Sequence, residues 1–185
     1  MRGFRYIDWS EYGRLAEALS EKVRSGGERF DLVIGVARGG IPVAMVVADR
    51  LGVVVDMINV KSYSDIGKRS KPRILSTVTE RIAGKRILLV DDLVDQGDTL
   101  EFLKRRFLAK RPRSLSTAVL FKKPWSRTEP DYFLESVDKW VVFPFEVGEV
   151  GRERSVRTGR NSPDSHKATA SPSASASRRR EVSIR

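Results

Sequence analysis

The first 150 residues alternate between short segments that are apolar throughout and segments whose apolar residues recur at the spacing of a helix. Residues 10–24 carry one apolar face and end before two glycines, which predicts an amphipathic helix. Two further helices are expected over residues 41–51 and 98–110. The continuously apolar segments predict strands at residues 30–36, 53–60, 86–90, 115–121 and 140–145.

Strands of this kind, separated by helices, are typical of a parallel sheet that is covered on both faces. The pattern therefore predicts an α/β fold with a doubly wound, mainly parallel sheet, in which ligands bind beyond the carboxyl ends of the strands. One connection departs from the alternation. Residues 61–85 join two predicted strands, are rich in Lys and Arg, and show little apolar periodicity. Because long connections inside a domain are often functional, we expect an active-site lid here.

The positive charge of the chain is concentrated at its C-terminal end. The formal net charge is +11, and residues 151–185 account for +6 of it. These residues include eight serines and no aromatic side chain, so they cannot bury enough apolar surface to offset the entropy lost on ordering. We expect a folded domain over residues 1–150 and a disordered, basic Ser/Arg-rich tail over 151–185. Arginines 178–180 could contact nucleic-acid phosphates, but such tails are more often simply solvated.

Several kinds of chemistry are disfavoured by what the sequence lacks. There is no cysteine, which excludes disulfides, thiolate metal sites and a thiol nucleophile. The one histidine, His166, lies in the predicted tail, which disfavours Ser-His-Asp and histidine-metal mechanisms. No segment approaches the roughly 18 apolar residues that span a bilayer, and residues 1–9 lack the apolar stretch of a signal peptide. We therefore expect a cytoplasmic protein without membrane association.

The most informative segment follows the apolar strand at residues 86–90. It contains Asp91 and Asp92, then a short loop with Gly97, then Thr99 at the start of a predicted helix. A helix start offers backbone N–H groups and a favourable dipole to a phosphate. A glycine lets the backbone approach the anion closely, and a threonine can cap the helix or bind a phosphate oxygen. Two carboxylates at a strand end can hold ribose hydroxyls or Mg2+.

This order of residues resembles the phosphoribosyl pyrophosphate signature of type I phosphoribosyltransferases: four apolar residues, an acidic pair, two apolar residues, then Asp-Thr-Gly-x-Thr. Gln96 departs from the pattern, because the family usually has a threonine there that helps hold the 5′-phosphate. The resemblance implies that Asp91 and Asp92 hold the ribose and Mg2+, and that Asp95 acts as general base or acid on the N7 proton of a purine. The implied 5′-phosphate site consists of Asp95, Gln96, Gly97, Asp98 and Thr99.

A second glycine-rich turn supports this resemblance. Residues 33–42 form a strand, an Arg-Gly-Gly turn and a helix start, and an arginine between a strand and two glycines can pair with pyrophosphate while the backbone stays close. The turn resembles the pyrophosphate loop of the family, which implies a catalytic role for Arg38 and a cis peptide between Ala37 and Arg38. A Ser-Tyr pair resembles the start of the family's flexible catalytic loop. The implied pyrophosphate site consists of Ala37, Arg38, Gly39, Ser62 and Tyr63.

The C-terminal part of the predicted domain narrows the choice of base. Residues 119–124 and 138–146 are similar to the end of the xanthine-guanine and hypoxanthine-guanine enzymes. The resemblance implies that Lys123 donates to O6 of the purine, that Trp140 stacks on the ring, and that the carbonyl of Val141 meets the base edge. These roles suit the chemistry, since an ammonium prefers an oxygen acceptor to an amino group. Glu146 stands where the family has an aspartate on the magnesium or pyrophosphate side.

Together these matches cover roughly residues 31–147 and imply a reaction. Ribose 5-phosphate would pass from Mg2+-bound phosphoribosyl pyrophosphate to a free 6-oxopurine (guanine, xanthine or hypoxanthine), with release of pyrophosphate, as in purine salvage. The family likeness also implies a small hood formed by the terminal segments and a homodimer or homotetramer. Two alternatives remain open: transfer to another base, such as adenine, orotate or uracil, and a regulator that senses phosphoribosyl pyrophosphate without catalysis.

Overall fold

The structure, a computed structural model, describes residues 3–62 and 72–146. Short strands, long strands and three helices follow one another along the chain in an α/β order. The elements are β1 (Phe4–Tyr6), α1 (Trp9–Ser25), β2 (Leu32–Ala37), α2 (Gly40–Leu51), β3 (Val54–Ser62), β4 (Pro72–Ser76), β5 (Arg86–Val94), α3 (Asp98–Leu108), β6 (Ser114–Lys122), β7 (Tyr132–Ser136) and β8 (Trp140–Val142).

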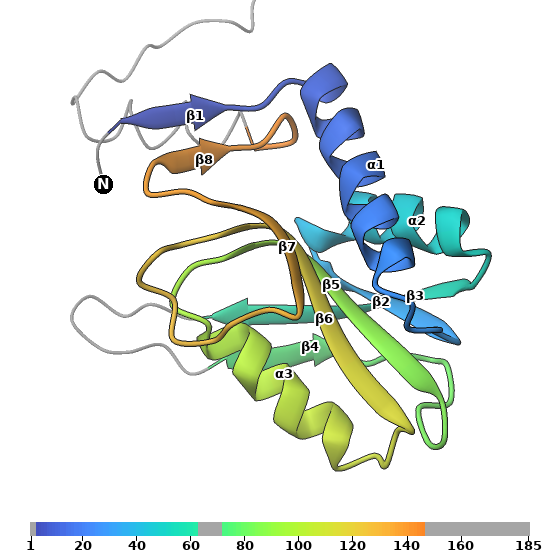
Figure 1. Ribbon diagram of the computed structural model, residues 1–185. Coiled ribbons are helices and arrows are strands. Elements are labelled where there is room, and N and C mark those ends of the chain that lie inside the picture. The colour runs from blue at the N-terminus through green and yellow to red at the C-terminus, as the bar shows by residue number, and fades with distance from the viewer. Residues whose placement is uncertain (1–2, 63–71, 147–185) are drawn as a thin grey trace, which may run out of the picture. The chain divides into compact units, whose positions relative to one another are not determined.

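A central sheet carries the strands in the order β4-β3-β2-β5-β6-β7. All neighbours pair in parallel except β4, which runs antiparallel to β3 at one edge. Helices α1 and α2 cover one face of the sheet and α3 covers the other (Figure 1). The chain therefore has the predicted doubly wound, mainly parallel α/β fold.

Strand β5 shows why both faces must be apolar. Its alternate residues Leu88 and Val90 pack with the core formed by α1 and α2. Ile87 and Leu89 point to the opposite face and pack with residues of α3. All four are fully buried, as the period of two along a strand between two helical layers requires.

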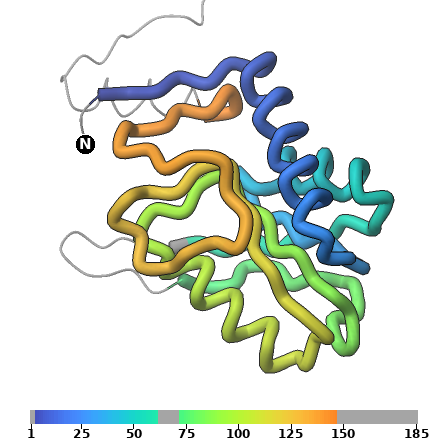
Figure 2. The backbone as a smooth tube through the Cα atoms, viewed as in Figure 1, coloured from blue at the N-terminus to red at the C-terminus, as the bar shows by residue number. Residues whose placement is uncertain are grey.

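A second, two-stranded sheet joins the two ends of the described chain. β1 pairs in parallel with β8, so that Phe4 lies beside Trp140, and the blue and orange segments run side by side in Figure 2. The Arg5 guanidinium attaches this hood to the main sheet. It pairs with Glu135 at 2.6 Å and lies 4.8 Å from the ring centre of Phe121. The predicted hood of terminal segments is thus confirmed.

Several predicted element boundaries were wrong. The strand expected at 86–90 continues to Val94, because the backbone ladder with β6 runs on past the acidic pair. The strand expected at 140–145 ends at Val142 and belongs to the hood. The connection expected over 61–85 is in part a strand pair, since Lys61 pairs with Arg73. Residues 63–71 of the predicted lid, and the predicted tail at 151–185, lie outside the described residues.

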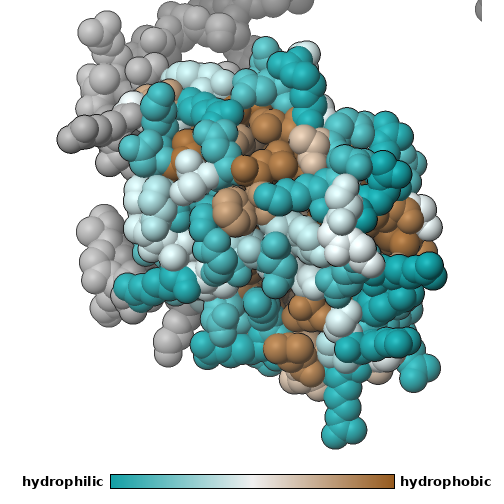
Figure 3. Space-filling model, viewed as in Figure 1, coloured by the Kyte–Doolittle hydropathy of each residue, from teal (hydrophilic) through white to brown (hydrophobic). Residues whose placement is uncertain are grey.

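The surface in the view of Figure 3 is mainly hydrophilic, with separate hydrophobic patches. Large apolar side chains are exposed on α2, on strands β3 and β4, and in the hood, among them Met45, Val54, Met57, Leu75 and Phe4. None of the helices in the described part of the chain combines the length and apolar character that crossing a membrane requires.

Candidate active site

The carboxyl end of β5 places two carboxylates side by side in an unfavourable environment. The backbone N–H of Asp92 donates to Asp91 Oδ1 at 3.0 Å. Burial raises the pKa of Asp91 well above its usual range, and the Asp92 charge raises it further. Burial, together with the charge of Glu146, raises the pKa of Asp92 to about 7. No cation among the described residues offsets these effects, so the end of β5 favours a positively charged or hydrogen-bonding ligand.

The turn between β2 and α2 lies directly against this acidic pair. The peptide bond between Ala37 and Arg38 is cis, as the family likeness implied. A Cβ atom added to Gly39 would lie 1.8 Å from Asp92 Oδ2. One added to Gly40 would lie 2.5 Å from the carbonyl oxygen of Val90. These two glycines are therefore required by the close approach of two backbone segments rather than by turn geometry alone.

A cleft of about 520 Å³ opens between these segments. Its walls bring together seven of the residues predicted from sequence: Ala37, Arg38, Gly39, Asp91, Asp92, Thr99 and Glu146. Sequence reasoning missed its apolar wall, which consists of Val36, Ile41, Pro42, Val60 and Phe145. The cleft lies at the carboxyl ends of β2 and β5, where the fold class places ligands.

The turn from Asp95 to Thr99 joins β5 to α3. Gly97 has φ +91° and is the N-cap of α3, a left-handed conformation that side chains other than glycine rarely adopt. No side chain caps the helix, so the capping role considered for Thr99 is not realised. Within the described residues, the backbone N–H groups of residues 96–99 donate no hydrogen bond. These donors and the helix dipole suit an anion.

A second cavity, of about 240 Å³, adjoins the first and shares Asp92 and Glu146 with it. It brings together the predicted base-binding residues Lys123, Trp140 and Val141 with Asp95. Its remaining walls, which sequence reasoning did not identify, are Leu93 and Phe143.

Lys123 and Trp140 present contrasting groups to this cavity. Lys123 is only 4% exposed, and its ammonium donates to the carbonyl oxygen of Lys139. Desolvation lowers its pKa, while the charges of Asp95 and Asp138 act in the opposite direction. Two of its three N–H donors remain available for a ligand. Trp140 is 45% exposed, an unusual exposure for a large aromatic side chain, and it offers a flat face for stacking.

Two aromatic residues near the site were not among the predicted site residues. Tyr12 of α1 packs edge-on against Phe143 and Phe145, with ring centres 6.0 and 5.6 Å apart. Burial, together with the charges of Asp92 and Asp91, raises its pKa. Trp125 donates its indole N–H to Asp95 Oδ1 at 2.7 Å. A lone aromatic residue in a loop has no periodicity from which such a contact could be inferred.

The donor set fits Mg2+ of the kind that is shared with a substrate. In the described residues no three Asp, Glu, His or Cys side chains converge into a ready-made metal cluster. Mg2+, however, usually binds one or two carboxylates, water and substrate phosphates rather than a cage of protein ligands. The raised pKa of Asp92 shows that a cation there would relieve an existing repulsion.

Three residues of the predicted phosphate turn, Gln96, Gly97 and Asp98, line neither cavity, and two further predicted residues lie at or beyond the limit of the described chain. Ser62 ends β3, but its side chain lies outside what the structure describes, and Tyr63 is outside the described residues. Gln96 and Asp98 have exposed side chains, so their contribution to a phosphate site would come from their backbone N–H groups.

The order of strands, the acidic pair opposite a glycine turn and the open helix start together define an α/β protein whose cleft suits a phosphorylated ligand. The sequence profile of the phosphoribosyl transferase domain matches residues 8–150. The chain belongs to the phosphoribosyltransferase family and is an enzyme of that class.

Individual relatives act on purines. A xanthine-guanine phosphoribosyltransferase of Idiomarina loihiensis is 31% identical over 145 residues, which cover 77% of this chain and 86% of the relative. The enzyme of the same name from a Ruegeria species is 33% identical over 158 residues, covering 79% and 86%. The crystal structure of a purine phosphoribosyltransferase from Pyrococcus horikoshii is 35% identical, with a TM-score of 0.69, and the match covers 77% of this chain and 93% of that one.

Proposed function

We propose that this protein transfers ribose 5-phosphate from phosphoribosyl pyrophosphate to a free 6-oxopurine, giving the nucleotide and pyrophosphate. The observation that carries the proposal is the junction of two cavities at Asp92 and Glu146. One cavity has the groups that suit a sugar phosphate and pyrophosphate, and the other has those that suit a flat base. Their shared wall is where a ribose would connect the two.

The first cavity would hold the phosphorylated substrate. The unused N–H groups of residues 96–99 and the start of α3 suit the 5′-phosphate. Arg38 and the backbone beside Gly39 suit the pyrophosphate. Asp91 and Asp92 would accept hydrogen bonds from the ribose hydroxyls. Gln96 can replace the family's threonine here because the backbone supplies the donors.

The second cavity would orient the base. Trp140 offers its face to the ring, Lys123 donates to O6, and the carbonyl of Val141 faces the base edge. Asp95 lies in the same cavity and would manage the N7 proton as the purine attacks the anomeric carbon. The buried ammonium of Lys123 favours an oxygen over the amino group of adenine, because an ammonium has donors only.

We propose that the phosphorylated substrate binds together with Mg2+. Asp91, Asp92 and Glu146 would hold Mg2+ together with the substrate's oxygens, and the ion would supply charge neutralisation for the departing pyrophosphate. Arg38, which lines the same cleft, would act on the same leaving group. Closure of the segment around Ser62 and Tyr63 over the cleft, a cytoplasmic location and a homodimer or homotetramer remain predictions, as does the boundary between residues 1–150 and the tail at 151–185.

The direct test is release of pyrophosphate from phosphoribosyl pyrophosphate and Mg2+ with each free base in turn. We expect release with guanine, xanthine or hypoxanthine, and none with adenine, orotate or uracil. Asp95→Ala should lower kcat by about 100- to 10,000-fold, the usual contribution of a general acid or base. The matched control is Asp49→Ala, which removes an exposed carboxylate that lines neither cavity and should retain full activity.

The outcome also separates the alternatives. Release with adenine, orotate or uracil in place of the 6-oxopurines would contradict the base assignment while keeping the chemistry. Binding of phosphoribosyl pyrophosphate without turnover of any base would favour the regulator. Removal of residues 151–185 should leave activity unchanged if the tail is accessory, and its loss would contradict the proposed domain boundary.

A further inference from the structure

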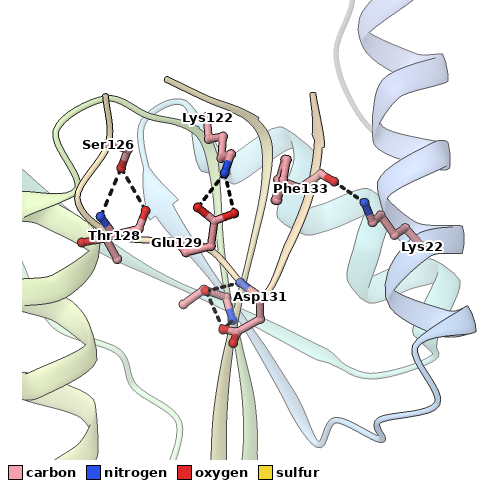
Figure 4. Close-up of polar contacts among 8 residues, drawn as sticks. Lys22, Lys122, Ser126, Thr128, Glu129, Asp131 and Phe133 are labelled. Atoms are coloured by element: carbon pink, nitrogen blue, oxygen red, sulfur yellow. Dashed lines mark hydrogen bonds and ion pairs between the residues drawn. The ribbon is translucent and has the colours of Figure 1, made fainter. Parts of the chain in front are cut away.

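The loop between β6 and β7, residues 123–131, is held firmly by its own polar contacts (Figure 4). At its base the Asp131 carboxylate accepts from the backbone N–H and the hydroxyl of Thr117, at 2.8 and 2.7 Å. Glu129 pairs with Lys122. At the tip the Ser126 hydroxyl donates to the carbonyl oxygen of Thr128 at 2.9 Å. A loop with this many internal bonds can fix the position of whatever it contacts.

What it contacts is the proposed phosphate turn. The backbone N–H of Arg127 donates to the carbonyl oxygen of Gln96 at 3.2 Å. The hydroxyl of Thr128 donates to the carbonyl oxygen of Gly97 at 3.3 Å. In a trans peptide the C=O and the following N–H point in opposite directions. Tying these carbonyls to the β6–β7 loop therefore directs the N–H groups of Gly97 and Asp98 away from the loop.

The same loop reaches Asp95 through a side chain. The indole N–H of Trp125 donates to Asp95 Oδ1 at 2.7 Å, a short distance for an N–H···O bond. Among the described residues nothing donates to Oδ2. The ring of Trp125 also lies 5.6 Å from the ammonium of Lys123. One aromatic side chain thus lies against two of the charged groups of the base cavity, Asp95 and Lys123.

We propose that Trp125 is a positioning residue that fixes the orientation of the Asp95 carboxylate, so that Oδ2 is presented to the purine. This inference rests on the proposed function, in which Asp95 handles the base proton. A carboxylate at an exposed turn can rotate freely, and a donor that binds one oxygen selects one orientation of the other. Misorientation of an acid–base group commonly costs about 10- to 100-fold in rate.

The test is Trp125→Phe, which keeps an aromatic ring and removes the N–H donor. We expect kcat with the preferred purine to fall about 10- to 100-fold, with the KM for phosphoribosyl pyrophosphate changed less than about twofold. The double variant Asp95→Asn, Trp125→Phe should be no slower than Asp95→Asn alone, because the indole acts through Asp95. The matched control is Trp9→Phe, since the indole of Trp9 donates no hydrogen bond to any described residue and Trp9 lines neither cavity.

Each result has one meaning. An unchanged kcat in Trp125→Phe would overturn the inference, and so would a double variant that is slower than Asp95→Asn by the full factor of the tryptophan change. A rise in the KM for phosphoribosyl pyrophosphate with constant kcat would show that Trp125 only supports the phosphate turn, which also overturns it. An unaltered chain that releases no pyrophosphate with any base would instead overturn the proposed function, and this inference with it.

Discussion

The two ends of β5 meet carboxylates in opposite situations: Asp31, just before β2, lies beside the amino end, and Asp92 lies within β5 near its carboxyl end. At the amino end Asp31 binds Arg86 through two side-chain contacts, at 2.5 and 3.0 Å, and through the backbone N–H of Arg86 at 2.8 Å. These bonds hold the pKa of Asp31 well below its usual range. At the carboxyl end no cation among the described residues pairs with Asp92, and burial together with the charge of Glu146 raises its pKa to about 7. Beside one end of β5 a carboxylate is therefore paired with a cation of the chain, whereas the carboxylate at the other end is buried beside further acidic groups.

The difference shows which end of the strand serves stability and which serves binding. A satisfied ion pair needs nothing from outside the chain. A carboxylate that is buried beside like charges costs folding free energy, and such a cost persists at sites where a ligand repays it. The glycines after Arg38 also point to binding at this end. Gly39 lets the turn lie directly against Asp92, and Gly40 lets it lie against the backbone of β5.

The largest effect on the reaction rate is expected from one methyl group added next to Asp92, at the carboxyl end of β5. In Gly39→Ala the new Cβ would lie 1.8 Å from Asp92 Oδ2, so the carboxylate or the turn must move. A displacement of about 1 Å at reacting groups can cost on the order of 100-fold in rate. We expect kcat/KM for pyrophosphate release to fall by at least that factor.

Gly13→Ala is the control for that change. Gly13 lies in α1, and a Cβ there would meet nothing within 4 Å. The same substitution should stabilise the helix by roughly 0.5–1 kcal/mol and leave activity unchanged. Equal activities of the two alanine variants would show that the close approach of Gly39 to Asp92 does not matter for the reaction.

The central strands and the helices could be predicted from sequence because burial on both faces leaves a continuous apolar pattern. The edge strands β4 and β7 were missed, since residues 72–76 and 132–136 are half-exposed and mixed in character. The end of β5 was placed too early for a related reason. A charged side chain at Asp91 marks a boundary in a hydropathy pattern, whereas backbone pairing with β6 does not depend on side-chain charge.

The candidate site divides in the same way. Residues in contiguous motifs, such as Arg38, Asp91 and Thr99, could be predicted because the residues of each motif are neighbours in the sequence. The contact of Trp125 with Asp95 joins residues 30 positions apart, and only the return of the β6–β7 loop to the phosphate turn creates it. No local pattern encodes that return.

A smaller effect is expected on stability, and it tests how much the buried charge of Asp92 destabilises the fold. Because the folded pKa of Asp92 is about 7, above the unfolded value near 3.9, the folded state holds a proton that the unfolded state releases. Stability should therefore fall as pH rises from about 4 to about 7, and the cost should be complete above that. Asp92→Asn removes this charge. At pH 8 the free energy of unfolding of the variant, measured in urea, should therefore be higher by on the order of 2 kcal/mol.

The pH series decides the matter. At pH 4.5 the variant and the unaltered chain should unfold at nearly the same urea concentration, and the gap should open towards pH 7. A constant gap across this range would mean that the asparagine stabilises the fold by some route other than the charge at position 92. A variant that is less stable at pH 8 would contradict the comparison between the two ends of β5.

The smallest expected effect, with the opposite pH trend, comes from the other end of the strand. The pKa of Asp31 is lower in the folded state than in the unfolded state, so its contribution to stability is present above about pH 4 and is lost as pH falls below that. Asp31→Asn should lower the urea midpoint by a constant amount between pH 5 and 8, and the difference should shrink in more acidic solution. Because both side chains of the ion pair are about one-third exposed, salt should weaken the effect. Activity per folded molecule should be unchanged, since Asp31 and Arg86 line neither cavity. A loss of activity without a loss of stability would show that the amino end of β5 has a functional role, and would contradict its assignment to stability alone.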